Sequence, residues 1–172
     1  MGETYLVTGG AGFIGSHVVD ELLSRGESVR VIDNFSTGNR ENLSRSSGDV
    51  QLVEGDLRSY ERAHKAVAGV DYVIHLAALP SVPRSVQDPL TTNAVNITGT
   101  LNILLAARDA GVRRVVTASS SSVYGPSAVS PKPESLVPSR ISRIMTNKVL
   151  LTGVSADKDR TRDSVSGPSE RP

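Results

Sequence analysis

The chain has 172 residues, of which 38% are hydrophobic, 22% are charged and only 3% are aromatic, and it contains no cysteine. This composition excludes a collagen-like chain, a disulfide scaffold and a fully disordered protein, and no apolar run approaches the ~18 residues of a membrane span. Lys and Arg number 19 against 18 Asp and Glu, which leaves a net charge of +1 without a basic cluster, so nucleic acid is not an expected partner.

Apolar periodicity predicts strands and helices in regular alternation along the first 120 residues. Strands are expected at 5–8, 29–32, 50–53, 71–76 and 113–118, and helices at 13–23, 60–68 and 93–110. Continuously apolar strands that alternate with helices imply a parallel sheet covered on both faces. Because crossovers between such strands are right-handed, we expect a doubly wound α/β sheet.

The pattern changes after residue 125. Four prolines at positions 126, 131, 133 and 138 predict a loop, and residues 141–151 form one more candidate helix. Residues 152–172 contain 3 hydrophobic and 8 charged residues, too little apolar surface to offset the entropy of ordering. We therefore expect one domain over residues 1–151 and a polar, disordered tail over residues 152–172.

A glycine-rich turn follows the first predicted strand and reads Thr8-Gly9-Gly10-Ala11-Gly12-Phe13-Ile14-Gly15. Glycine suits such a turn because the backbone needs permissive φ angles and a Cβ would block a pyrophosphate. The free amides and the positive end of the helix dipole then hold the anion. On its own this pattern also fits a plain strand–helix turn without a ligand.

An acidic residue decides between these interpretations. Asp33 ends the second predicted strand 18 residues after Gly15, close to the ~20 residues expected for a carboxylate that binds the adenosine ribose. The same carboxylate would repel a 2′-phosphate. The sequence therefore predicts dinucleotide binding, with NAD favoured over NADP.

Residues 4–139 resemble the extended short-chain dehydrogenase/reductase family, specifically its NAD-dependent nucleotide-sugar epimerase/dehydratase branch. The resemblance is carried by GGAGFIG, VIDNFSTG, Asp56-Leu57, HLAA at 75–78, NAVNITGTLNILLAA at 93–107 and SSSSVYG at 119–125. The stretch SVPRS is most similar to UDP-glucose and UDP-N-acetylglucosamine 4-epimerases. The resemblance implies a Rossmann fold, NAD as cofactor and transient hydride transfer at a carbon of a UDP-sugar.

The resemblance also implies roles for individual positions. Asp33 and Asn34 would contact the adenosine ribose, and Asp56 with Leu57 the adenine. Asn96 would tie the central helix to the active-site strand. The structural alternatives are a helix cap at Asp56 and a core amide at Asn96. The residues expected around the cofactor are Gly9, Gly12, Phe13, Ile14, Gly15, Asp33, Asn34, Ser36, Thr37, Gly38, Asp56, Leu57, Leu76, Ala77, Ala78, Asn96 and Lys148.

The catalytic positions match the family only in part. The resemblance makes Ser120 a catalytic hydroxyl that bonds the sugar oxygen, and makes Lys148 the lysine that lowers the pKa of a tyrosine base four residues before it. Ile144 stands at that tyrosine position and has no titratable proton. Neither Tyr72 nor Tyr124 has a lysine four residues later.

The resemblance also stops before the C-terminal domain that binds the nucleotide sugar in this family. We therefore expect an epimerase/dehydratase-like protein that is impaired in catalysis and lacks its substrate domain. The alternative is a non-catalytic NAD-binding module or a truncated gene product.

The remaining features concern metals, location and assembly. His17, His64 and His75 lie at no metal-ligand spacing, so no metal site is predicted, and His75 is interpreted as a strand-packing residue. The N-terminal residues show no charged region followed by an apolar one, so we expect a cytoplasmic protein without membrane attachment. The resemblance implies a homodimer through the central helix and the helix bearing Lys148, and the altered sequence of the latter leaves the oligomeric state open.

Overall fold

The computed structural model describes residues 2–44, 48–120, 124, 130, 131, 133, 135 and 136. Five strands form one sheet: β1 (Thr4–Thr8), β2 (Ser28–Asp33), β3 (Val50–Glu54), β4 (Tyr72–His75) and β5 (Arg114–Thr117). Their order is β3-β2-β1-β4-β5, and every neighbouring pair is parallel. This order confirms the predicted doubly wound parallel sheet.

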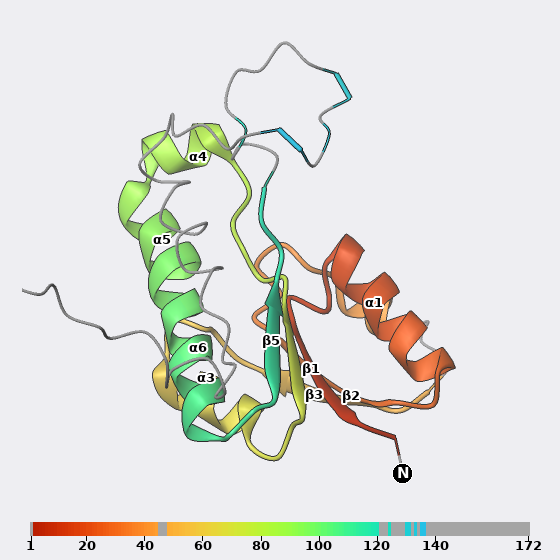
Figure 1. Ribbon diagram of the computed structural model, residues 1–172. Coiled ribbons are helices and arrows are strands. Elements are labelled where there is room, and N and C mark those ends of the chain that lie inside the picture. Colours follow the sequence, from red (N-terminus) through yellow and green to blue (C-terminus); the bar gives the residue numbers. More distant parts are fainter. Residues whose placement is uncertain are drawn as a thin grey trace, which may run out of the picture.

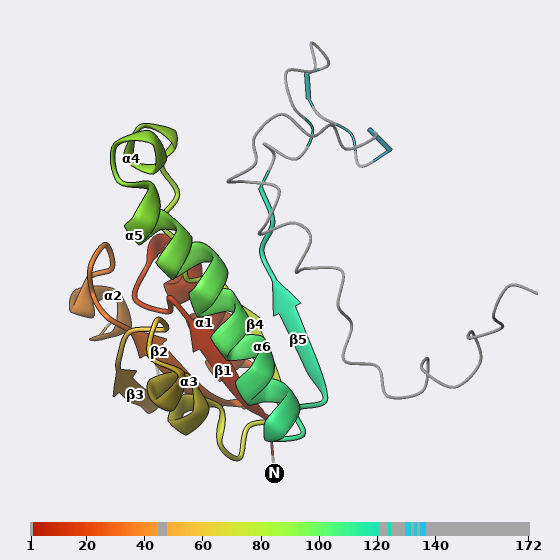
Figure 2. The same ribbon diagram turned by 90° about the vertical axis from the view of Figure 1, so that its left-hand side faces the viewer.

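Helices lie on both sides of the sheet (Figure 1). Helix α1 (Phe13–Ser24) covers one face, and α3 (Tyr60–Val67) and α6 (Gly99–Asp109) cover the other. Figure 2 shows α6 crossing in front of the sheet, with β5 at its outer edge. None of the helices in the described ranges is long and apolar enough to cross a membrane.

Alternation along the central strand divides the core into two clusters. Leu6 and Val7 are both fully buried, but Leu6 packs with α3 and α6 whereas Val7 packs with α1. Successive side chains of a strand point to opposite faces, so a strand buried on both sides must be apolar at every position. This is why the central strands have continuous apolar runs.

Short helices after β4 were absent from the predicted elements. They are α4 (Val82–Gln87) and α5 (Pro89–Asn93), and a π-helical turn, η1 (Ala94–Thr98), joins α5 to α6. The predicted helix over 93–110 therefore begins earlier, at Pro89. Ser81 caps α4 and Asp88 caps α5, each with a proline in the first turn, and these capping signals specify helices too short to show apolar periodicity.

Two further elements differ from expectation. A short helix, α2 (Arg40–Ser44), follows β2 and was not predicted. The prediction of a sheet covered on both faces holds at the centre but not at β5 within the described ranges. There Val115 packs against the cluster shared by α3 and α6, while Val116 on the opposite face is 54% exposed. The candidate helix over 141–151 and the tail over 152–172 lie outside the described residues.

Candidate functional site

A cleft of about 370 Å³ opens at the carboxyl ends of the strands. After β1 the chain turns toward one face of the sheet, and after β4 it turns toward the other face. The cleft lies between these two exits, which is where doubly wound sheets bind ligands. The expected cofactor-binding residues that line it are Gly9, Gly12, Phe13, Ile14, Gly15, Asp33, Asn34, Ser36, Thr37, Gly38, Asp56, Leu57, Leu76, Ala77 and Ala78.

The glycine turn is shaped by the protein's own backbone. Gly9 has a φ of +70°, and a Cβ there would lie 2.9 Å from the backbone of Ala77. A Cβ on Gly15 would lie 2.1 Å from the carbonyl oxygen of Gly9. These two positions therefore require glycine whether or not a ligand is bound. Gly12, by contrast, is the N-cap residue of α1 and lines the cleft. Its amide donates to the Gly9 carbonyl at 3.1 Å, so the first amides of α1 and the helix dipole are the groups that can face an anion there.

Asp33 connects the glycine turn to the end of β2. Its Oδ2 accepts a hydrogen bond from the Ala11 amide at 3.0 Å, and its Oδ1 accepts one from the Phe35 amide at 2.8 Å. A carboxylate offers about four acceptor sites. Asp33 can therefore hold the turn in place and still accept hydrogen bonds from the hydroxyls of a bound ribose.

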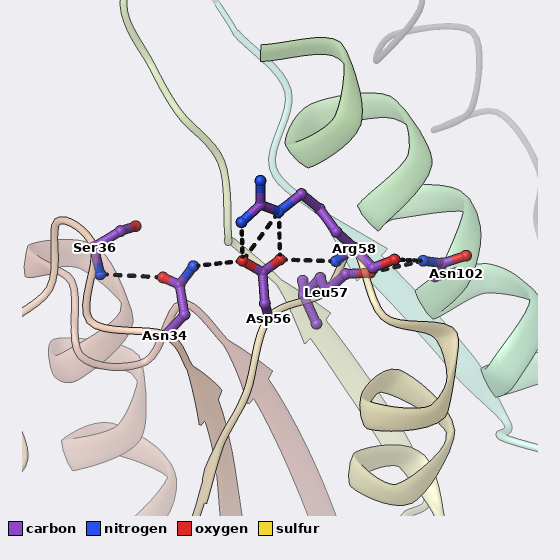
Figure 3. A network of polar contacts seen from close by, with 6 residues as sticks. All are labelled: Asn34, Ser36, Asp56, Leu57, Arg58 and Asn102. Carbon is purple, nitrogen blue, oxygen red and sulfur yellow. Dashed lines mark hydrogen bonds and ion pairs between the residues drawn. The ribbon is translucent and has the colours of Figure 1, made fainter. Parts of the chain in front are cut away.

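Asp56 is held at the next strand exit by a network of polar contacts (Figure 3). The Arg58 guanidinium donates to both carboxylate oxygens, and the Asn34 amide donates to Oδ2 at 3.0 Å. The Ser36 amide in turn donates to Asn34 Oδ1. The hydrogen bonds from Arg58 lower the pKa of Asp56 to about 2. Asp56 is therefore an ionised acceptor at neutral pH.

A buried chain of hydrogen bonds supports the β4 exit. Thr8 Oγ1 accepts from the Leu76 and Ala77 amides at 3.2 Å and contacts His75 Nδ1 at 2.7 Å. His75 Nε2 contacts Thr100 Oγ1 at 2.9 Å, and all three side chains are at most 1% exposed. His75 is thus a packing residue, as predicted, and it links the cleft wall to α6.

Asn96 braces the same wall from the π-helical turn. Its Oδ1 accepts from the Leu79 amide at 2.8 Å, and its Nδ2 donates to the Leu79 carbonyl at 3.2 Å. Asn96 is not among the described residues that line the cleft. Asn96 thus acts on the backbone of the segment after β4, and its predicted tie to the active-site strand stays a prediction.

Of the two expected catalytic residues, Ser120 lies in the described part of the chain and Lys148 does not. Ser120 is exposed and follows β5, but neither Ser120 nor Tyr124 is among the described residues that line the cleft. Tyr72 begins β4, at the edge opposite the cleft, and stacks on Tyr5 with ring centroids 5.0 Å apart. Lys148 and Ile144 lie outside the described residues.

Other residues line the cleft without having been predicted. Five of them lie near a strand end or just after β4, namely Ile32, Gly55, Leu79, Pro80 and Ala118, and the sixth, Val95, belongs to η1. The carboxyl-edge rule for parallel sheets would have found most of them. Within the described ranges, no three His, Asp or Glu side chains gather as metal ligands would.

Comparison with known proteins places this arrangement in a family. The sequence profile of the NAD dependent epimerase/dehydratase family matches residues 5–148. The chain belongs to this family.

The most similar relatives include proteins of different activity. The UDP-glucose 4-epimerase of Erwinia amylovora is 39% identical over 157 residues, which cover 84% of this chain and 47% of that protein. The UDP-glucuronic acid decarboxylase 1 of Xenopus tropicalis is 39% identical over 129 residues, 75% of this chain and 30% of that one. The chain therefore spans about half the length of the epimerase and a smaller share of the decarboxylase.

Solved structures share the fold. The UDP-glucose 4-epimerase of Thermus thermophilus in complex with NAD superposes with a TM-score of 0.77 at 40% identity. The match covers 86% of this chain and 48% of that one.

The buried network predicts the protonation state of His75. Thr100 donates its hydroxyl to the Asn96 carbonyl at 2.8 Å, so it must accept from His75 Nε2. Thr8 already accepts two amides, so its hydroxyl proton goes to Nδ1. We expect the imidazole to carry its proton at Nε2 and not at Nδ1, measured by long-range ¹H–¹⁵N correlation. The Thr100→Val variant should weaken this preference, and an Nδ1–H tautomer would contradict the network.

Proposed function

We propose that this chain binds NAD in the cleft and forms the cofactor-binding half of a nucleotide-sugar epimerase or dehydratase, of the UDP-sugar 4-epimerase type. One observation supports the proposal most strongly. A glycine turn suited to an anion and two carboxylates, Asp33 and Asp56, lie together at the C-terminal ends of the strands. The NAD-bound Thermus relative of the same fold supports it. We assign residues 1–151 to this cofactor-binding unit.

The residues present fit a dinucleotide laid along the strand ends. The pyrophosphate would lie over Gly12 at the start of α1, and the adenosine ribose would meet Asp33, whose acceptor sites are only partly used. Asp56 and Leu57 would face the adenine. The nicotinamide half would follow Leu76, Ala77 and Ala78. Bound NAD would supply the hydride acceptor, and the chain's own residues bind and orient it.

The proposed substrate is a UDP-sugar, as the names of the relatives suggest. Ser120 would donate or accept a hydrogen bond at the sugar oxygen on the carbon that exchanges hydride. Proton transfer needs a base, and Ile144 offers none. We therefore propose that this chain retains cofactor binding and is impaired in turnover.

NAD is expected to stabilise the folded chain. A ligand at a hundredfold excess over its dissociation constant adds about 2.7 kcal/mol, which corresponds to a rise in Tm of roughly 5–10 °C for a domain of this size. Calorimetric titration should show Asp33→Asn binding NAD about 10–100-fold more weakly, because a hydrogen bond to a charged acceptor is lost.

The matched control is Asp49→Asn. It also removes one carboxylate charge, but Asp49 precedes β3 and so lies at the N-terminal end of the strands, away from the cleft. Its affinity for NAD should equal that of the wild type. An absence of stabilisation by NAD or NADP would contradict the cofactor assignment. Equal affinities for the Asp33 variant and the wild type would contradict the ribose contact alone.

Conversion of UDP-galactose to UDP-glucose is expected to stay at the background level of a protein-free reaction, because Ile144 cannot transfer a proton. The assay measures product by chromatography with NAD present at the concentration that stabilises the fold. Turnover above background that Ser120→Ala abolishes would show that the chain is catalytically competent.

We also propose that the chain forms a homodimer through the outer face of α6. This face is apolar: Leu101 is 42% exposed, Leu104 and Leu105 are half-buried, and the half-buried Ile97 of η1 precedes them. The opposite face of α6 packs on the sheet, as Figure 2 shows. A contiguous apolar face of this kind marks an interaction site, and in a two-fold dimer it would meet its own copy.

Light scattering coupled to size exclusion tests the dimer. Leu101→Arg should weaken association by about tenfold or more, which is 1.4 kcal/mol, because a two-fold interface buries the new charge twice. Leu52→Arg on β3 is the matched control, since Leu52 is 40% exposed on a different element. A wild-type monomer at all concentrations, or equal effects of both variants, would refute this interface.

A further inference from the structure

Helix α6 carries a buried amide that its apolar packing does not explain. Asn102 is only 8% exposed. Its Nδ2 donates to the Leu57 carbonyl at 2.8 Å and to the Arg58 carbonyl at 3.1 Å (Figure 3). Carbonyl oxygens only accept hydrogen bonds, so the amide nitrogen, and not the oxygen, must face them. Asn102 therefore holds two successive backbone groups of the segment after β3.

The same helix touches this segment a second time, one turn earlier. A Cβ on Gly99 would lie 3.2 Å from the Leu57 Cβ, so the absence of a side chain at Gly99 lets Leu57 lie against the helix. Leu57 is 7% exposed. It is thus held at its Cβ by Gly99 and at its carbonyl by Asn102.

The position of the Asp56 carboxylate depends on this segment. The Arg58 amide donates to Asp56 Oδ1 at 2.9 Å, and the Ser59 amide donates to the Asp56 carbonyl at 3.1 Å. The Arg58 guanidinium also binds the carboxylate, with Nη2 2.7 Å from Oδ2. A shift of the backbone at Leu57 and Arg58 would therefore move the acceptor at this end of the cleft.

We propose that Asn102 is a positioning residue that sets the preference of this end of the cleft for a purine with an exocyclic amino group. The inference rests on the proposed binding of NAD. Asn102 acts through Leu57 and Arg58. Asp56 already accepts four N–H groups, and of these only the Asn34 amide comes from outside the segment that Asn102 holds. In this geometry an amino group would take the place of the Asn34 amide on the ionised Asp56, whereas the carboxylate repels a carbonyl oxygen at the same place on the base.

The test compares NAD with nicotinamide hypoxanthine dinucleotide, in which a carbonyl oxygen replaces the amino group. Calorimetry of the full chain should show a wild-type preference for NAD of about tenfold or more, the usual worth of a hydrogen bond to a charged group. Asn102→Leu should reduce this preference to about threefold or less, chiefly through weaker NAD binding. Asn102→Gln keeps the amide donors and should restore part of the preference.

The matched control is Tyr60→Phe. It removes the Tyr60–Asp109 hydrogen bond of 2.8 Å between α3 and α6 without touching the segment after β3. This variant should keep the wild-type ratio of affinities, because a general loss of stability weakens both dinucleotides alike. An unchanged ratio in Asn102→Leu, with NAD still bound, would overturn the role of Asn102 and leave the proposed function standing.

Hydrogen exchange of the ligand-free chain provides a second readout that does not need NAD. The Arg58 and Ser59 amides, which both donate to Asp56, should exchange about tenfold faster in Asn102→Leu, as expected when a buried hydrogen bond is lost, and at the wild-type rate in Tyr60→Phe. If the wild type binds neither dinucleotide, the proposed function fails. Even in that case, unchanged exchange at these amides in Asn102→Leu would refute the positioning of the segment by Asn102. If Asn102→Leu does not fold, the same measurement is made on Asn102→Gln.

Discussion

The parallel pairing of β1 with β4 is the constraint on which the rest of the site depends. Its register places Thr8 opposite His75, and beyond these residues the two chains turn away from each other. Their exits touch only because Gly9 has no side chain, since a Cβ there would lie 2.9 Å from Ala77. The cleft opens at this point of divergence, where backbone amides of both exits are within reach of a ligand.

Side chains of η1 and α6 hold the segments around the cleft in place. Asn96 braces the backbone at Leu79, Thr100 completes the chain through His75, and Asn102 holds the segment that contains Leu57. Buried backbone groups outside regular structure need partners. When a helix packed on the sheet supplies these partners, the loop backbone is held in a more precise position than hydrogen bonds to solvent would give. The same residues that satisfy the backbone thus set the shape of the cleft.

Much of this fold could be predicted from the sequence because its signals are local. The apolar runs of the strands, the glycine turn and the acid at the end of β2 all lie within short stretches, and the structure has them in the predicted places. The missed helices α4 and α5 depend on single caps, Ser81 and Asp88, and not on periodicity. The face of β5 that is exposed at Val116 within the described ranges was missed because an apolar strand does not reveal which of its faces is covered.

The sequence by itself determined which chemical groups stand at the strand ends: the glycines of the turn after β1 and the carboxylates of Asp33 and Asp56. These are properties of residue type and spacing along the chain. Only the tertiary structure decided what those groups meet. Gly9 and Gly15 are required by the chain's own backbone, Thr8 meets His75 across 67 residues, and Asn102 reaches Leu57 across 45. Contacts between such distant residues are set by strand order and helix packing, and no local pattern records them.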